Sequence, residues 1–460
     1  MSNKKSIIHV TLSSRPDLLA LLENHPDKFP FLLETTALAT KSDNKGFDIL
    51  FALPQQQLVK DSENKIKLNH QLCETSSFLT ELDKIWRQEK IESTLEDEIA
   101  LPFCGGWFLY LGYELAAEIE PTIQFKKTNQ DVPVAFAIRT PAAIIYDHTQ
   151  EQTHIVIETE FADELESIKQ NIAAIKQSSM SDEAILTEAL KEENPDIYLH
   201  SVRRILEYIR EGDVFQVNLS RQWEAQLKPN VTDVNVYRHL RNTNPAPYSA
   251  IIKHNNFSVV SSSPERLFCT DGERIETRPI AGTRPRGETA RKDSDLQKEL
   301  ITNYKERAEH IMLIDLERND LGRICKPGTI QVDEFMAMES YAHVHHIVSN
   351  VSGQLSTGMT PGKIIRAVFP GGTITGCPKV RCMEIISELE RQPRGAYTGS
   401  IGYLNHSGNM DFNILIRSLT IQNQKTIFRA GAGIVADSVP EREVDETRAK
   451  AKGIIKALQD

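Results

Sequence analysis

The chain has 460 residues and a formal net charge of −11. This length predicts two domains or one large layered domain, and the acidic balance without any Lys/Arg-rich stripe argues against a nucleic-acid-binding protein. The six cysteines form no CxxC pair, and no apolar run is long enough for a signal peptide or a membrane span, so we expect reduced thiols in a cytoplasmic protein that contacts no membrane.

Residues 1–177 form the first expected region, in which short apolar strands alternate with turns. The expected strands cover 7–12, 48–53, 107–113, 142–146 and 153–158, and the last two pair as a hairpin. A helix is expected over 163–177. Residues 178–196 are polar and acidic with a proline near the end, which predicts a linker to a second region over 197–460.

The second region begins with an amphipathic helix that Gly212 ends, followed by an alternating strand over 214–223. Such a strand is either exposed to solvent on its polar face or lines a polar cavity, and the sequence leaves both open. Its two faces carry different side chains: Phe215, Val217 and Leu219 on one, and Gln216, Asn218 and Ser220 on the other.

Two hairpins are expected next, pairing 249–253 with 257–262 and 267–270 with 274–278. Glu265 lies between them, and residues 281–283 follow them. Proline and glycine near both stretches oppose continued strand pairing, so we expect Glu265 and residues 281–283 at the edge or mouth of a sheet. An ordinary alternative for Glu265 is a surface carboxylate paired with Arg266 or Arg278.

Three further patterns place charged or polar groups beside apolar ones. The helix over 305–324 puts Glu309 next to an apolar stretch, where a carboxylate needs a cation. Two adjacent histidines in the strand over 344–349 face opposite sides, so they do not share a metal. Residues 398–405 and 411–421 are expected as strands of one sheet, and Arg417 lies inside the second, where it needs a carboxylate partner.

The last strand and helix complete the pattern. Residues 432–436 predict a buried strand, Ser438 and Glu441 fit a capping box, and Pro440 suits the first helical turn. The helix has an apolar stripe, and Glu443, Glu446 and Lys450 share a separate charged face. Taken alone, that face would usually be an ordinary solvated surface.

Together the motifs GDVFQVNLS, SSSPERL, RPIAGTRPRG, ERAEHIMLIDLERNDLGR, VHHIVS, FPGGTITGCPKVRCMEII, GSIGYL and GAGIVADSVPEREVDET resemble those of the chorismate-utilising enzymes, in order, over about residues 197–458. This family includes anthranilate synthase component I, aminodeoxychorismate synthase component I, and the isochorismate and salicylate synthases. The resemblance implies an α/β fold in which two large, mostly antiparallel sheets pack together with helices outside.

The resemblance also implies roles for individual residues. Glu309, Glu443 and Glu446 correspond to the carboxylates that hold Mg²⁺ against the ring carboxylate of chorismate, and oxygen-only ligands suit that ion. Glu265 corresponds to the general acid that assists loss of the ring hydroxyl. The remaining correspondences are Arg417, Lys450 and the backbone at Gly402, Gly431 and Gly433 for binding substrate carboxylates, and His346 and Thr283 for lining the same pocket.

Two positions bear on the reaction. Members that add water carry a lysine base where this chain has Gln216, and a neutral amide cannot take a proton from water, so the resemblance implies an ammonia user supplied by a separate glutamine amidotransferase. Typical aminodeoxychorismate synthases have a covalently acting lysine where this chain has Ala281, as anthranilate synthases do. FPGGTITG and PFLLETTA instead favour aminodeoxychorismate synthase. The resemblance therefore favours aminodeoxychorismate synthase component I, with anthranilate synthase component I, or both activities in one enzyme, as the alternative. A non-catalytic chorismate-binding subunit is the alternative of another class.

Overall fold

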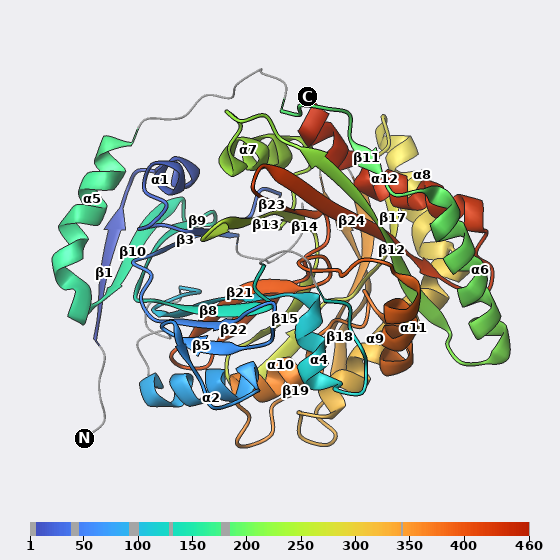
Figure 1. Ribbon diagram of the computed structural model, residues 1–460, viewed down its shortest axis with the longest axis horizontal. Helices are drawn as coiled ribbons and strands as arrows, with labels where there is room; N and C mark the ends of the chain where they lie inside the picture. Colours follow the sequence, from blue (N-terminus) through green and yellow to red (C-terminus); the bar gives the residue numbers. More distant parts are fainter. Residues whose placement is uncertain are drawn as a thin grey trace.

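The computed structural model describes residues 6–37, 46–91, 101–127, 132–175, 185–341 and 344–459. Two large antiparallel sheets face each other, and helices cover their outer faces (Figure 1). The expected fold class is therefore confirmed. Both sheets combine strands from residues 1–177 with strands from residues 197–460, so the two regions are joined by backbone hydrogen bonds within each sheet.

In the first sheet, strands from residues 1–177 continue into strands that follow residue 190 in the chain. Within the described residues it has twelve strands, and β20 pairs only with β12. The order is β1 (Ile7–Leu12), β10 (Gln152–Glu158), β9 (Ala142–Asp147), β3 (Phe47–Ala52), β2 (Phe31–Glu34), β13 (Tyr248–His254), β14 (Phe257–Ser263), β23 (Ser418–Gln422), β24 (Lys425–Ile434), β12 (Gln216–Gln226) and β11 (Lys191–Glu192), with β20 covering Gly376–Cys377.

The second sheet also has twelve strands in the described parts of the chain. Its long strand β19 pairs with β17 and β16 along one side and with β18 (Gln331–Ser340) along the other. The order is β17 (Ile280–Pro285), β19 (Val344–Gln354), β16 (Arg274–Thr277), β15 (Arg266–Thr270), β22 (Met410–Asn413), β21 (Ser400–Asn405), β7 (Gly106–Leu111), β8 (Ala135–Thr140), β4 (Gln57–Lys60), β5 (Ile66–Leu68) and β6 (Gln71–Leu72).

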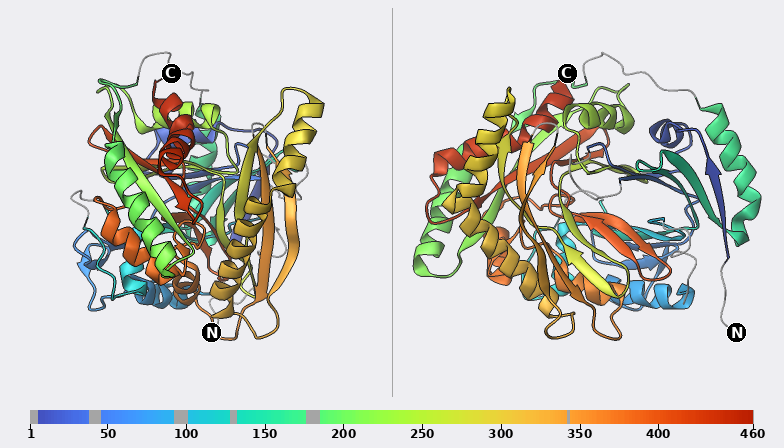
Figure 2. Two further views of the ribbon diagram at one scale, coloured as in Figure 1. Left: turned by 90° about the vertical axis from the view of Figure 1, so that its right-hand side faces the viewer. Right: turned by 180° about the vertical axis from the view of Figure 1, so that it is seen from behind.

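Helices α7 and α12 lie over the first sheet, and α2 and α10 lie under the second, while α8 and α9 stand at one end (Figures 1 and 2). The structure gives these bounds: α1 (Leu18–Asn24), α2 (Phe78–Glu89), η1 (Tyr113–Leu115), α4 (Ala116–Ile119), η2 (Thr159–Glu164), α5 (Leu165–Ala174), α6 (Pro195–Glu211), α7 (Asp233–Thr243), α8 (Ala290–Thr302), α9 (Tyr304–Gly322), α10 (Pro361–Val368), α11 (Lys379–Leu389) and α12 (Pro440–Gln459).

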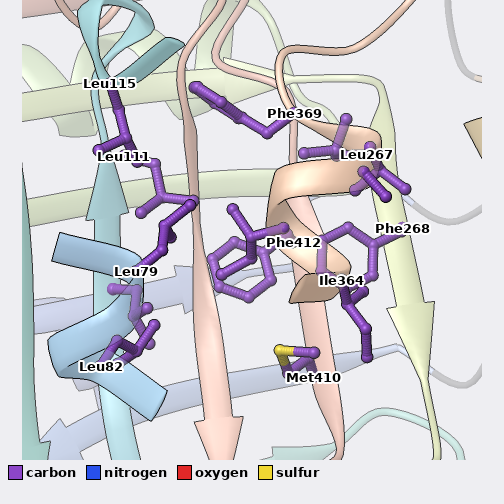
Figure 3. Close-up of a cluster of buried hydrophobic side chains, with 14 of the residues drawn as sticks. Leu79, Leu82, Leu111, Leu115, Leu267, Phe268, Ile364, Phe369, Met410 and Phe412 are labelled. Atoms are coloured by element: carbon purple, nitrogen blue, oxygen red, sulfur yellow. The ribbon is translucent and has the colours of Figure 1, made fainter. Parts of the chain in front are cut away.

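Apolar layers hold this arrangement together. One layer lies between the sheets and includes Phe31, Phe51 and Phe108, while others lie between each sheet and its helices. Figure 3 shows the layer outside the second sheet, where Leu79 of α2 and Ile364 of α10 pack with the strands. Fully burying one such side chain stabilises the fold by roughly 1.5–3 kcal/mol, so these layers fix the sheets that carry the polar side chains described below.

Most expected elements are present, including both hairpins of the second region and the hairpin formed by β9 and β10. The linker expected over 178–196 is described only from residue 185. There, Leu186 forms an isolated bridge with Leu227, and β11 pairs with β12, so this part of the segment is attached to the edge of the first sheet.

Four local expectations are wrong. Residues 411–421 do not form one strand, because Arg417 has a left-handed φ of 51° that an extended strand cannot accommodate; the chain crosses from β22 in the second sheet to β23 in the first. The strand expected over 214–223 begins only at Gln216, and Phe215, just before it, is 68% exposed. Strand pairing was expected to stop near residues 281–283, yet it continues through 280–285 around a bulge at Gly282; these residues form β17, the edge strand of the second sheet, so their expected place at an edge is confirmed.

The fourth concerns the start of α12. Ser438 Oγ accepts a hydrogen bond from the backbone N–H of Val435, which precedes the helix, and Glu441 pairs with Arg203, so these two residues do not make the expected capping box. Pro440 is the first helical residue, as expected. In the described part of the chain, no helix is both long and apolar enough to cross a bilayer.

Candidate active site

Helices α9 and α12 bring together the carboxylates singled out in the sequence. Glu309 is half-buried on α9, and its pKa responds to the charges of Glu446 and Lys450 on α12. Lys450 Nζ lies 2.9 Å from a carboxylate oxygen of Glu446 and donates a hydrogen bond to the carbonyl oxygen of Gly431 at 3.1 Å. On the charged face of α12, Glu443 is buried, whereas Glu446 and Lys450 are about half exposed, and Lys450 joins this face to β24.

The pKa values of two of these carboxyls indicate a shortage of positive charge. Burial raises the pKa of Glu309 above its ordinary value, and Glu306 and Glu446 raise it further. Burial likewise raises the pKa of Glu443, with Glu446 adding to the effect. Lys450 and Lys305 oppose both shifts. A cation placed among these oxygens would relieve the repulsion that the lysines relieve only in part.

The carboxylates suit Mg²⁺ by their chemistry, since they offer oxygen donors alone. No three His, Cys, Asp or Glu side chains in the described ranges are already arranged around one point as metal ligands. Because Lys450 pairs with Glu446, binding of a cation by Glu446 would require that this ion pair open.

The polar face of β12 lies against two glycines of β24. Gln216 is buried, and its Nε2 donates a hydrogen bond to Glu309 Oε1 at 3.3 Å. A Cβ atom added to Gly433 would lie 2.2 Å from Gln216 Nε2, so only glycine leaves room for this amide. Of the two alternatives for the polar face of this strand, the polar interior is therefore confirmed.

Glu265 lies between β14 and β15 and is only 6% exposed. Burial raises the pKa of its carboxyl to about 7, while Arg417 and Lys450 act in the opposite direction. The ordinary alternative of a surface ion pair is wrong: Arg266 pairs with Asp411, and Arg278 pairs with Glu334 and Glu339. Burial in turn lowers the pKa of Arg417, which Glu265 opposes.

β17 and β19 supply the opposite side of the site. The two strands pair Thr283 with His346, and Thr283 Oγ1 lies 3.0 Å from His346 Nδ1. Burial, with Arg417 adding to it, lowers the pKa of His346 to about 4, so this imidazole is neutral at pH 7. Its neighbour His345 faces the other way and contacts Asp293 and Ser340, which confirms that the two histidines face opposite sides.

Two of the singled-out residues differ from the rest. Ala281 lies on β17, the strand that also carries Thr283. It pairs with Ile347 of β19, and its methyl group is only 6% exposed. Gly402 lies inside β21, paired with Leu109 on one side and Phe412 on the other, so its backbone N–H belongs to the second sheet's ladder. The contacts recorded for the described residues do not join Gly402 to the carboxylates.

The structure adds three residues that the sequence analysis did not single out as site residues. Tyr397 Oη and Asn218 Oδ1 lie 2.7 and 2.9 Å from the position that a Cβ atom of Gly431 would take. Glu317, two turns after Glu309 on α9, is buried, and burial together with Asp320 raises its pKa to about 8. Alternation along β12 could have found Asn218, but Tyr397 and Glu317 carry no signal in the sequence.

A cavity of about 350 Å³ lies farther along the same face of the first sheet. It is lined by Gln222 and Glu224 of β12 and by Arg429 of β24. Arg394 and Arg429 both pair with the buried Glu390, and these charges stand between the cavity and Gln216. Glu309, Glu443 and Glu446 do not line this cavity, whereas Tyr397, which lies beside Gly431, does.

Comparisons with known proteins agree with this arrangement. The profile of the chorismate binding enzyme family matches residues 35–456. The chain is 42% identical over 367 residues to aminodeoxychorismate synthase component 1 of Bacillus subtilis, covering 78% of this chain and 77% of that protein. It is 42% identical over 396 residues to an anthranilate synthase component I-like protein of Synechocystis, covering 84% and 79%. The crystal structure of anthranilate synthase component I from Streptococcus pneumoniae superposes with a TM-score of 0.80 at 30% identity, covering 91% and 94%.

Proposed function

Because this chain belongs to the chorismate-binding enzyme family, we propose that it is aminodeoxychorismate synthase component I, which converts chorismate and ammonia to 4-amino-4-deoxychorismate. The observation that carries the choice of ammonia over water is Gln216. This buried, uncharged side chain donates a hydrogen bond to Glu309, and an amide cannot remove a proton from water. Ammonia brings its own lone pair and needs no base to become a nucleophile.

Anthranilate synthase component I is the second candidate, and Ala281 favours it. The buried methyl group offers no nucleophile that could add to the ring, so amination at C4 here would proceed without the covalent lysine of typical aminodeoxychorismate synthases. The similarity to the Bacillus subtilis aminodeoxychorismate synthase supports amination at C4, while the Synechocystis relative is named for anthranilate synthase.

In this proposal Glu265 is the general acid. Hydroxide is a poor leaving group, so loss of the ring hydroxyl requires a proton donor. With a pKa of about 7, the Glu265 carboxyl holds its proton at neutral pH in a substantial fraction of molecules, whereas an ordinary glutamic acid would have lost it. A positioned acid of this kind typically contributes about 10²–10⁴-fold to the rate.

The two carboxylates of chorismate would be bound by Arg417 and Lys450, with the backbone at Gly431 and Gly433 beside them. Neutral His346 and Thr283 would line the other side of the ring. Glu309, Glu443 and Glu446 would hold Mg²⁺, which supplies positive charge that binds the ring carboxylate and withdraws electrons from the ring. Gly402 was assigned to this group by resemblance, and its place inside β21 gives no support to that role.

A glutamine amidotransferase would act as partner and supply the ammonia. The relatives named above include proteins designated component 1, which fits a two-component enzyme. In the chain itself, Cys104 lies in PFCGGW, which lacks the GxCxGxQ sequence of a glutaminase nucleophile.

Product identification tests the proposal. Purified protein is supplied with chorismate, Mg²⁺ and an ammonium salt, with and without aminodeoxychorismate lyase. 4-Aminobenzoate formed only with the lyase would support amination at C4. Anthranilate formed without the lyase would establish the second candidate, and the absence of any aminated product would contradict both.

A further inference from the structure

Two amide side chains of β12 project toward the glycines of β24. Gln216 and Asn218 share one face of the strand, and Asn218 is directly paired with Gly433. The space beside Gly431 is bounded by oxygens: Leu219 O and Tyr397 Oη at 2.7 Å and Asn218 Oδ1 at 2.9 Å from the position of an added Cβ atom. Three oxygens therefore converge beside one glycine: the Asn218 amide oxygen, the Leu219 carbonyl oxygen, which already accepts from Tyr198 Oη at 3.3 Å, and the Tyr397 hydroxyl, which can also donate.

Both amide oxygens lack partners. Gln216 Oε1 and Asn218 Oδ1 are buried, and neither has a hydrogen-bond partner among the residues that the structure describes. The orientation of Gln216 follows from chemistry, because the Glu309 carboxylate only accepts hydrogen bonds and so must face the amide nitrogen. A buried acceptor without a donor is costly, and such groups are normally satisfied. The site is therefore short of a donor that a small ligand could supply.

Ammonia matches this need better than water or ammonium does. It has three N–H donors and one lone pair, so neutral acceptor oxygens can hold it by its hydrogens and leave the lone pair directed at carbon. Water has only two donors. Ammonium has no lone pair, and the two amides offer no net negative charge to attract it.

We infer that Asn218, with Gln216 beside it, binds the ammonia molecule that attacks chorismate, and this inference rests on the proposed amination reaction. The ammonia lone pair forms the C–N bond as the C–O bond of the ring hydroxyl breaks. Glu265 gives its proton to the departing oxygen, which leaves as water. The ammonium group formed on the ring then loses one proton, which restores the acid, so that chorismate and ammonia give the amine and water. Asn218 is a positioning residue in this scheme and exchanges no proton.

The test uses the full chain with ammonium chloride as the source of ammonia, at an alkaline pH where free ammonia is abundant. Asn218→Leu nearly keeps the size of the side chain and removes its amide group, both the oxygen acceptor and the NH₂ donor. We expect the KM for ammonia to rise about tenfold while the KM for chorismate changes less than about twofold, because one hydrogen bond to the nucleophile is lost. Gln222→Leu is the matched control, since Gln222 lies on the same face of β12 and lines the cavity of about 350 Å³, and it should leave both KM values unchanged.

Asn218→Asp guards against a variant that merely disturbs the fold. It keeps an acceptor oxygen in the same place, so its KM for free ammonia should stay within about threefold of the wild-type value. An unchanged KM for ammonia in Asn218→Leu, or an equal rise in the KM for chorismate, would overturn the inference while the wild-type protein still forms the aminated product. Failure of the wild-type protein to aminate chorismate would instead overturn the proposed function, and the inference with it.

Discussion

Replacing Glu265 with glutamine should change both catalysis and the pH dependence of stability. Burial raises the pKa of this carboxyl from 4.5 to about 7. The folded protein therefore keeps a proton that the unfolded chain releases between these two values, so Glu265 destabilises the fold progressively as the pH rises through this window. At about 1.4 kcal/mol per pH unit, the cost reaches about 3 kcal/mol above pH 7. Glutamine has nearly the same shape and cannot ionise.

Urea unfolding at about pH 5 and about pH 8 measures this effect. The Glu265→Gln variant should lie within about 1 kcal/mol of the wild-type protein at the lower pH and exceed its free energy of unfolding by up to about 3 kcal/mol at the higher pH. Its turnover should fall about 10²–10⁴-fold at both. Glu273→Gln, in the exposed turn between β15 and β16, is the control and should change neither quantity. A stability difference that does not vary with pH would refute the claim that burial keeps Glu265 protonated.

Three other changes test the neighbouring groups. Glu317→Gln should raise the free energy of unfolding progressively as the pH rises from about 4.5 to about 8, because the folded wild-type protein keeps a proton there that the unfolded chain releases; urea unfolding at several pH values across this window would show it. Gly433→Ala should lower kcat/KM more than about tenfold, since the new Cβ would lie 2.2 Å from Gln216 Nε2; steady-state kinetics measure this. Glu443→Gln should raise the Mg²⁺ concentration for half-maximal rate at least about tenfold without loss of fold, as followed by metal titration of the rate.

Matched variants separate these effects from general disturbance. Gly322→Ala at the end of α9 meets its nearest heavy atom only at 4.0 Å and should retain wild-type kinetics. Glu441→Gln on α12 removes an exposed carboxylate that pairs with Arg203 at 3.4 Å and should leave the Mg²⁺ dependence unchanged. Equal losses of kcat/KM in Gly433→Ala and Gly322→Ala would contradict the role given to Gly433. An unchanged Mg²⁺ concentration for half-maximal rate in Glu443→Gln would contradict the role given to Glu443.

Much of the fold was predictable where local pattern and turn chemistry agree. The hairpin of β13 and β14 and the helix that ends at Gly212 appear as expected, and Gly212 has the left-handed φ of 84° that such a helix end requires. Arg417 shows where pattern fails. The residues around it are mostly apolar and predict a continuous strand, yet the chain turns there to pass from one sheet to the other.

The sequence by itself determined which chemical groups this protein has: carboxylates at helical spacing on α12, an amide where a lysine base would be needed for water, and a methyl group at Ala281. Only the tertiary structure decided which of these groups are buried and how burial changes their pKa values. Glu265 and His346 acquire pKa values of about 7 and about 4 because long-range strand pairing and helix packing bury them, and burial is a property of the whole fold. For the same reason, the unpartnered amide oxygen of Asn218 comes to lie beside Gly431 only when residues more than 200 positions apart in the chain pair as β12 and β24.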